Sequence, residues 1–127
     1  MKKYFYLAAI AAVFLVGISS CTKTKGCTDP TATNYNASAE QDDGTCAYAG
    51  NVVFYYATSG TNATVVINGQ TGTVTTAFSS TPSCGTSGCA NFTLPIGTYN
   101  YTASSTFTNW SGSVIVTKNG CTAQVLQ

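Results

Sequence analysis

Polar and apolar residues alternate in short runs along most of the chain beyond residue 50. Such alternation predicts β-strands with one buried face, because successive side chains of a strand point to opposite sides. It places Tyr99, Tyr101 and Ala103 on one face of a strand, and Trp110 and Val114 on one face of the next. No segment here has the length or periodicity of a helix. The expected strands cover residues 52–58, 63–68, 71–78, 89–94, 98–105, 110–117 and 121–126.

Turn-forming residues separate these runs. Asn68-Gly69 is a strong β-hairpin signal, and Asn119-Gly120 turns the chain into the last strand. Residues 79–88 are rich in Ser, Pro and Gly, which predicts a long loop. The pattern therefore predicts that residues 50–127 form an all-β domain, a small seven-stranded β-sandwich.

Three segments of this domain resemble prealbumin-like or immunoglobulin-like sandwiches of the PEGA and carboxypeptidase-regulatory-like type. They are Val65-Val66-Ile67-Asn68-Gly69, Leu94 to Ala103 and Trp110-Ser111-Gly112. In the second segment, Leu-Pro-Ile-Gly-Thr-Tyr places a Pro-Gly turn before a strand. The resemblance implies a fold and says little about function, because unrelated functions share such folds.

The first twenty residues have the pattern of an export signal. Lys2 and Lys3 follow Met1, and Tyr4 to Ile18 is an uncharged apolar run of fifteen residues. A transmembrane helix needs about 20 residues, so this length favours the apolar core of a signal peptide at residues 1–20. A non-cleaved anchor helix is the alternative.

Ile18-Ser19-Ser20-Cys21 resembles a lipobox, the site where bacterial lipoprotein precursors are cut just before a cysteine. The family prefers Gly or Ala at the position of Ser20, and an ordinary secretory cut near Ser20 is the alternative. The resemblance implies lipidation of Cys21, with acyl chains such as palmitate anchoring the protein to a bacterial outer membrane. More than one chain is needed, since each buried methylene contributes only ~0.8 kcal/mol.

A short flexible tether, residues 21–26, and a compact unit, residues 27–48, are expected between the signal and the sandwich. The apolar residues of the unit are few beyond Tyr35, Tyr48 and its alanines, too few for folding by hydrophobic burial alone. A disulfide between Cys27 and Cys46 would disfavour the unfolded chain by about 3 kcal/mol for a loop near this size.

The same unit resembles the motif C-T-D-P-x-A-x-N-Y-N-x-x-A-x-x-D-D-G-S/T-C-x-Y of secreted and surface proteins of Bacteroidetes. About twenty residues from Cys27 to Tyr48 match it. The resemblance implies lineage and export, not an activity. Surface-export signals of lipoproteins in that lineage are acidic after the lipidated cysteine, whereas Lys23 and Lys25 are basic. The choice between the periplasmic face and the cell surface therefore stays open.

The chain has six cysteines, and three remain once the lipidated cysteine and the Cys27–Cys46 pair are set aside. A bond between Cys84 and Cys121 would close a longer loop than one between Cys84 and Cys89, which favours the former. The latter pairing is the alternative. The leftover thiol, Cys89 in the favoured pairing, has no Lys, Arg or His beside it to lower its pKa, so we expect no redox role.

Charged residues are scarce, and histidine is absent. No basic face is available for a nucleic acid, so we expect no nucleic-acid partner. Without His, a Ser-His-Asp triad and most zinc sites are excluded. Lys118 is the single charged side chain of residues 50–127, which leaves few groups for general acid–base catalysis. We therefore expect a protein that is not an enzyme.

Calcium is the one cofactor for which the sequence offers ligands. Asp29, Asn34, Asn36, Asp42 and Asp43 supply the hard oxygen atoms that calcium prefers. Their spacing is not that of an EF-hand loop. The alternative is that these side chains form turns and caps beside the disulfide.

The function that these patterns favour is a structural or interaction module of the cell envelope, held on the membrane by lipid. The alternative is a glycan-binding module that uses exposed aromatic side chains, with Trp110, Tyr99 and Tyr101 as candidates. Packing of these rings into the core competes with that role. An exposed aromatic row would favour a glycan ligand over an envelope-protein partner.

Overall fold

The computed structural model describes residues 22–58 and 60–127. The regular elements within these ranges are nine β-strands, which confirms the predicted all-β class. The described ranges contain no helix long and apolar enough to span a membrane. The expected signal peptide, residues 1–20, and the expected lipidation site, Cys21, lie outside the described residues.

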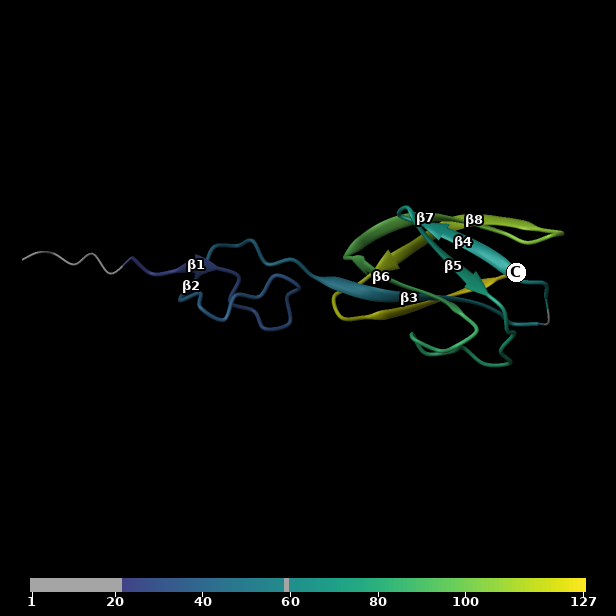
Figure 1. The fold of residues 1–127 in the computed structure, drawn as a ribbon, viewed down its shortest axis with the longest axis horizontal. Coiled ribbons are helices and arrows are strands. Elements are labelled where there is room, and N and C mark those ends of the chain that lie inside the picture. The colour runs from purple at the N-terminus through teal and green to yellow at the C-terminus, as the bar shows by residue number, and fades with distance from the viewer. Residues whose placement is uncertain (1–21, 59) are drawn as a thin grey trace, which may run out of the picture.

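Two units follow one another along the long axis of the molecule (Figure 1). The smaller, N-terminal unit holds two short parallel strands, β1 (Lys25–Gly26) and β2 (Gln41–Asp42). The Thr24 carbonyl accepts the backbone N–H of Glu40 at 2.8 Å. The segment expected as a flexible tether is therefore partly ordered, and the unit begins before Cys27.

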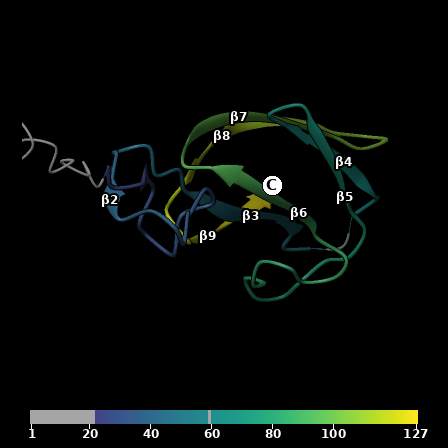
Figure 2. The same cartoon turned by 60° about the vertical axis from the view of Figure 1, so that its left-hand side comes forward.

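The larger unit is a pair of facing sheets, seen from two sides in Figures 1 and 2. One sheet has the strand order β6-β3-β9, in which β3 and β9 are parallel; the other is antiparallel, with the order β5-β4-β7-β8. This arrangement is a β-sandwich. The strands are β3 (Ala49–Tyr56), β4 (Ala63–Ile67), β5 (Gln70–Val74), β6 (Ala90–Pro95), β7 (Gly97–Ser104), β8 (Asn109–Val116) and β9 (Cys121–Leu126).

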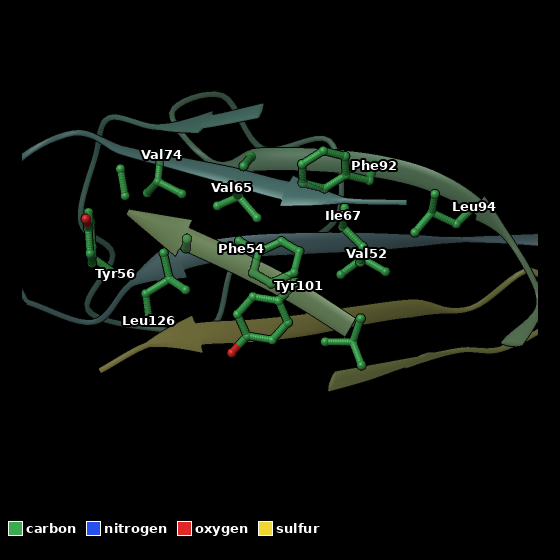
Figure 3. Close-up of a cluster of buried hydrophobic side chains, with 14 of the residues drawn as sticks. Val52, Phe54, Tyr56, Val65, Ile67, Val74, Phe92, Leu94, Tyr101 and Leu126 are labelled. Atoms are coloured by element: carbon green, nitrogen blue, oxygen red, sulfur yellow. The ribbon is translucent and has the colours of Figure 1, made fainter. Parts of the chain in front are cut away.

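The core lies between the two sheets and is built from the alternate residues of each strand (Figure 3). Phe54 at its centre is fully buried, with ring centroids 5.8 Å from Phe92 and 4.8 Å from Tyr101 in edge-on packing. Gly112 lies opposite Tyr101, and a Cβ atom there would come within 3.0 Å of the Tyr101 hydroxyl. The β8 glycine thus makes room for the tyrosine ring.

Turn geometry explains most strand ends. Asn68 and Gly69 both have positive φ, 48° and 73°, which is the backbone of the tight hairpin expected between β4 and β5. β5 ends at Val74, earlier than the predicted residue 78. The N–H groups of Thr75 and Thr76 donate to the Gly88 carbonyl instead of to carbonyl groups of a neighbouring strand.

The loop of residues 79–88, which we call the covering loop, lies across the outer face of the three-stranded sheet. A disulfide joins Cys84 to Cys121, and the Asn91 side chain accepts the Gly85 N–H at 2.6 Å. Strand register places Cys121, Asn91 and Val53 on this same face. Val53 is fully buried although it points away from the core, so this side of the sheet is covered as well.

Candidate functional site

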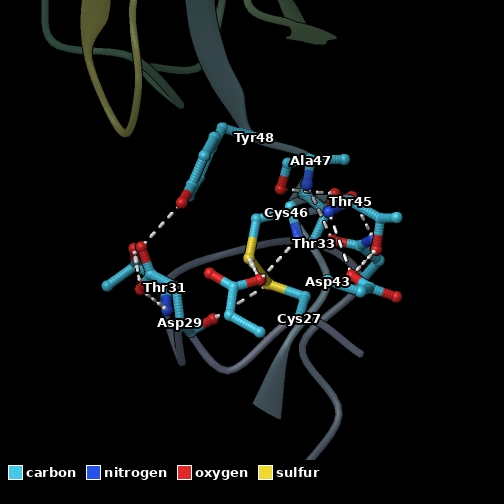
Figure 4. The surroundings of a disulfide bond; sticks show 12 residues. Cys27, Asp29, Thr31, Thr33, Asp43, Thr45, Cys46, Ala47 and Tyr48 are labelled. Atoms are coloured by element: carbon cyan, nitrogen blue, oxygen red, sulfur yellow. Dashed lines mark hydrogen bonds between the residues drawn. A yellow bond between two sulfur atoms is a disulfide. The ribbon is translucent and has the colours of Figure 1, made fainter. Parts of the chain in front are cut away.

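The N-terminal unit is held by the Cys27–Cys46 disulfide and by side-chain-to-backbone hydrogen bonds (Figure 4). Asn34 donates to the Thr45 carbonyl and accepts the Ala47 N–H, both at 2.7 Å. Asp43 accepts the N–H and the hydroxyl of Thr45, and these bonds lower the pKa of Asp43. Both disulfides in the structure are the ones that the sequence favours.

The proposed calcium ligands form turns instead of a shared site. Asp29 accepts the N–H of Thr31, Asp42 accepts the N–H of Gly44, and Asn36 accepts the N–H of Ser38. Asn34 and Asp43 are engaged with Thr45, as described above. Within residues 22–58 and 60–127, no group of three or more His, Cys, Asp or Glu side chains is placed to hold a metal ion. The hydrogen bonds of these residues therefore stabilise turns and loops of the N-terminal unit, and Asp29 has a further contact that is described next.

One carboxylate joins the two units. Asp29 Oδ2, from the N-terminal unit, accepts hydrogen bonds from Lys118 Nζ and from the Tyr48 hydroxyl, each at 2.8 Å. The Lys118 ammonium also lies 3.8 Å from the centroid of the Tyr48 ring, a cation–π distance. Figure 4 shows the Tyr48 hydroxyl directed at this carboxylate. We call Asp29, Tyr48 and Lys118 the junction.

The junction shifts the ionisation of its members. Lys118, then Thr31 and Tyr48, hold the pKa of Asp29 well below its ordinary value of 3.8. The bond to Asp29 raises the pKa of Lys118 above 10.5 and that of Tyr48 above 10.0. The ion pair therefore stabilises the folded protein fully between these ordinary values of Asp29 and Lys118. This contribution declines as the pH falls below 3.8 or rises above 10.5.

We expect Lys118→Met to let the two units reorient independently at pH 7, because it removes the charge that holds Asp29. In ¹⁵N relaxation, the rotational correlation time of the N-terminal unit is then expected to become shorter than that of the sandwich, whereas the two match in the unsubstituted protein. Lys23→Met, which removes an exposed lysine outside the junction, is the control. Matched correlation times in Lys118→Met would show that the chain link and the remaining contacts, such as the hydrogen bond from the Ile96 N–H to the Tyr48 carbonyl, hold the units together without the ion pair.

The three aromatic candidates do not form an exposed row. Tyr101 is buried in the core, and Tyr99 and Trp110 are partly buried against it. The Trp110 and Tyr56 rings lie with their centroids 5.7 Å apart. The row of exposed aromatics that would favour glycan stacking on a flat face is therefore not present at these residues.

Trp110 does line a cavity of about 610 Å³, which we call the distal cavity. It lies at the end of the sandwich where β3 and β9 finish and β8 begins, opposite the N-terminal unit (Figure 1). A second cavity of about 430 Å³ shares Trp110 and Gln127 with it. The residues that line the distal cavity are Tyr56, Thr58, Gly60, Thr61, Ser105, Phe107, Thr108, Trp110, Leu126 and Gln127.

Two polar atoms at this cavity lack a partner. The Tyr56 hydroxyl and Trp110 Nε1 are buried, and neither has a hydrogen bond within the described part of the chain. Burial raises the pKa of Tyr56, and the nearby Ser105 hydroxyl lowers it to a smaller extent. Such unpaired groups cost about 1–3 kcal/mol each, and a polar ligand that displaced the side chains covering them would recover part of this cost.

Sequence reasoning missed both the junction and the distal cavity. Asp29 and Lys118 are 89 residues apart, and their one signal was that Lys118 is the sole charge of the sandwich. Tyr56 and Leu126 are the last residues of β3 and β9, and Phe107 lies in the loop between β7 and β8. Alternation predicts which of them face inward, but the space between them depends on how the loops close.

No protein-family model, characterised protein or solved structure matches this chain. Functional interpretation therefore depends on the arrangement of its own side chains. The junction and the distal cavity each bring polar groups of separate elements together.

Proposed function

We propose that this protein is an exported lipoprotein of the bacterial cell envelope that acts as a structural or interaction module without catalysis. Lipid on Cys21 is proposed to anchor it to the outer membrane, and its sandwich to contact an envelope component. The lipobox-like residues before Cys21 support the anchor. The lack of histidine and the shortage of acids in residues 50–127 support a role without catalysis.

Disulfide bonding supports export. Four cysteines are joined in two bonds, and the leftover Cys89 is buried. Disulfides persist in secreted and periplasmic proteins and are rare in the cytosol, where thiols are kept reduced. Burial also raises the pKa of Cys89, which disfavours the reactive thiolate. The sulfur chemistry is thus suited to bracing a fold rather than to catalysis.

The junction is the main observation in support of an interaction module whose sandwich is held at a fixed position relative to the small unit. Asp29 bonds Tyr48 and Lys118, and the Tyr48 carbonyl accepts the Ile96 N–H at 3.0 Å. These contacts hold the small unit against one end of the sandwich. A lipid on Cys21 would then place the membrane on the side of the small unit and the distal cavity on the opposite side. The small unit would serve as a stiff spacer.

Lineage and fold family belong to the same proposal. The match of Cys27 to Tyr48 to the Bacteroidetes motif supports an origin in that lineage. The corner at Leu94 to Tyr99, where Gly97 has a φ of 152°, supports assignment to the prealbumin-like sandwiches with seven strands. Because Lys23 and Lys25 are basic, the proposal does not choose between the periplasmic face of the outer membrane and the cell surface.

Intact mass of the full chain, expressed with export and recovered from membranes, tests the proposal. We expect a polypeptide that begins at Cys21 and carries several acyl chains. Alkylation under denaturing conditions is expected to modify one cysteine without reductant, namely Cys89, and five after reduction, since two disulfides open. Cys21→Ala is the control and is expected to remain unacylated. A chain that retains Met1, or one that is cut elsewhere and carries no lipid, would refute lipid anchoring.

A further inference from the structure

We propose that the distal cavity is a binding site for a neutral saccharide. The inference concerns the cavity alone and does not depend on lipid anchoring. Its volume of about 610 Å³ lies within the range of small-molecule sites, roughly 300–1,000 Å³. Three kinds of observation carry it: the charge of the lining, the unpaired buried donors and the rigid loop that presents Phe107.

The lining points to an uncharged ligand. None of the ten described residues that line the cavity has a charged side chain, so an ionic group would lose its hydration without gaining an oppositely charged side chain as a partner. Aromatic rings and hydroxyl groups both line it: Tyr56, Phe107 and Trp110 together with Thr58, Thr61, Ser105 and Thr108. A sugar ring has the matching properties, because its C–H faces pack on aromatic rings and its hydroxyls both donate and accept hydrogen bonds.

The unpaired donors distinguish a saccharide from an apolar ligand. The side chain of Tyr56 is 6% exposed, and its hydroxyl and Trp110 Nε1 have no partner among the described residues. An apolar molecule would leave both groups unpaired and would gain no hydrogen bond from them. Sugar oxygens would accept from both once the lining side chains that cover these two buried atoms shift.

The loop between β7 and β8 is built to hold an exposed aromatic ring at the cavity. The Ser105 N–H donates to the Thr108 carbonyl at 2.8 Å, and Ser105 Oγ accepts the N–H of Thr108 at 3.1 Å and that of Phe107 at 3.3 Å. Phe107 at its tip is 82% exposed. These hydrogen bonds hold the backbone of the turn, so little backbone entropy is lost when a ligand contacts Phe107, which favours binding.

Trp110 is the only tryptophan of the chain, so intrinsic fluorescence reports on this site. The full chain, kept in a detergent without a sugar headgroup, is titrated with cellotetraose, maltotetraose, xylotetraose and chitotetraose. We expect a saturable change with at least one of them. Phe107→Ala is expected to weaken that binding about fivefold or more, whereas Ile115→Ala, which removes a 62%-exposed side chain of β8 outside the lining, leaves it within about twofold.

Tyr56→Phe separates binding from folding. The substitution removes an unpaired buried hydroxyl, so the melting temperature of the free protein is expected to rise. Saccharide binding is expected to weaken about fivefold, because one hydrogen bond is lost. No saturable response to any of the four sugars would overturn the proposal. So would saturation by n-decanol, by the detergent or by a capped neutral peptide in their place, or a Tyr56→Phe variant that binds as well as the unsubstituted protein.

Discussion

Replacing both Cys84 and Cys121 with serine is expected to lower the free energy of unfolding of the sandwich by about 4 kcal/mol. The disulfide spans 37 positions of sequence, and opening it returns that conformational freedom to the unfolded chain. The covering loop would also be released from the outer face of the sheet, where Val53 is buried. Urea denaturation followed by Trp110 fluorescence measures the change, which is a large share of the roughly 5–15 kcal/mol typical of a folded domain.

The double variant is needed because a single one leaves a thiol that can pair with Cys89. Cys89→Ala is the matched control. It removes a buried cysteine that forms no disulfide, and its cost is expected to stay near 1 kcal/mol. If Cys89→Ala and the double variant lowered the free energy of unfolding equally, the cysteines would stabilise the fold through burial and not through cross-linking.

Phe54→Ala is expected to cost about 3–5 kcal/mol, because it empties the centre of the core. The ring is fully buried and packs edge-on against Phe92 and Tyr101, so its removal loses both contacts and leaves a cavity between the sheets. Thermal and urea unfolding followed by circular dichroism measure the loss. Phe54→Leu, which keeps most of the volume, is expected to cost about 1.5 kcal/mol and to remain folded.

Phe107→Ala is the matched control for this prediction, since it removes the same side chain from a position that is 82% exposed. Its effect on stability is expected to stay within about 0.5 kcal/mol. A loss of stability in Phe107→Ala comparable to that in Phe54→Ala would show that the Phe107 ring packs on the sandwich in solution.

Local pattern was sufficient to predict the all-β class. Ala63, Val65 and Ile67 alternate with exposed residues, and the structure buries these three. The same pattern could not predict β1 and β2, which are two residues each and depend on a contact between Thr24 and Glu40. Elements this short carry no periodicity, so only the folded disulfide unit determines them.

The candidate sites were harder to predict than the fold. Oxygen ligands clustered in sequence at Asp29, Asp42 and Asp43 indicated calcium, yet each side chain accepts a hydrogen bond within its own turn, and Asp29 also bonds Lys118. Trp110 was selected for an exposed face, and it lines a cavity instead. Composition tells which groups are available; whether they converge depends on strand ends and loops far apart in sequence.

The junction has a consequence for how the sandwich meets other molecules. Lys118 is the one charged side chain of residues 50–127, and Asp29 neutralises it at 2.8 Å. The sandwich therefore projects almost no electrostatic field, and diffusional encounters with it are not steered. Association rates should change little with ionic strength, in contrast to those of charged binding surfaces, whose attraction fades over the Debye length.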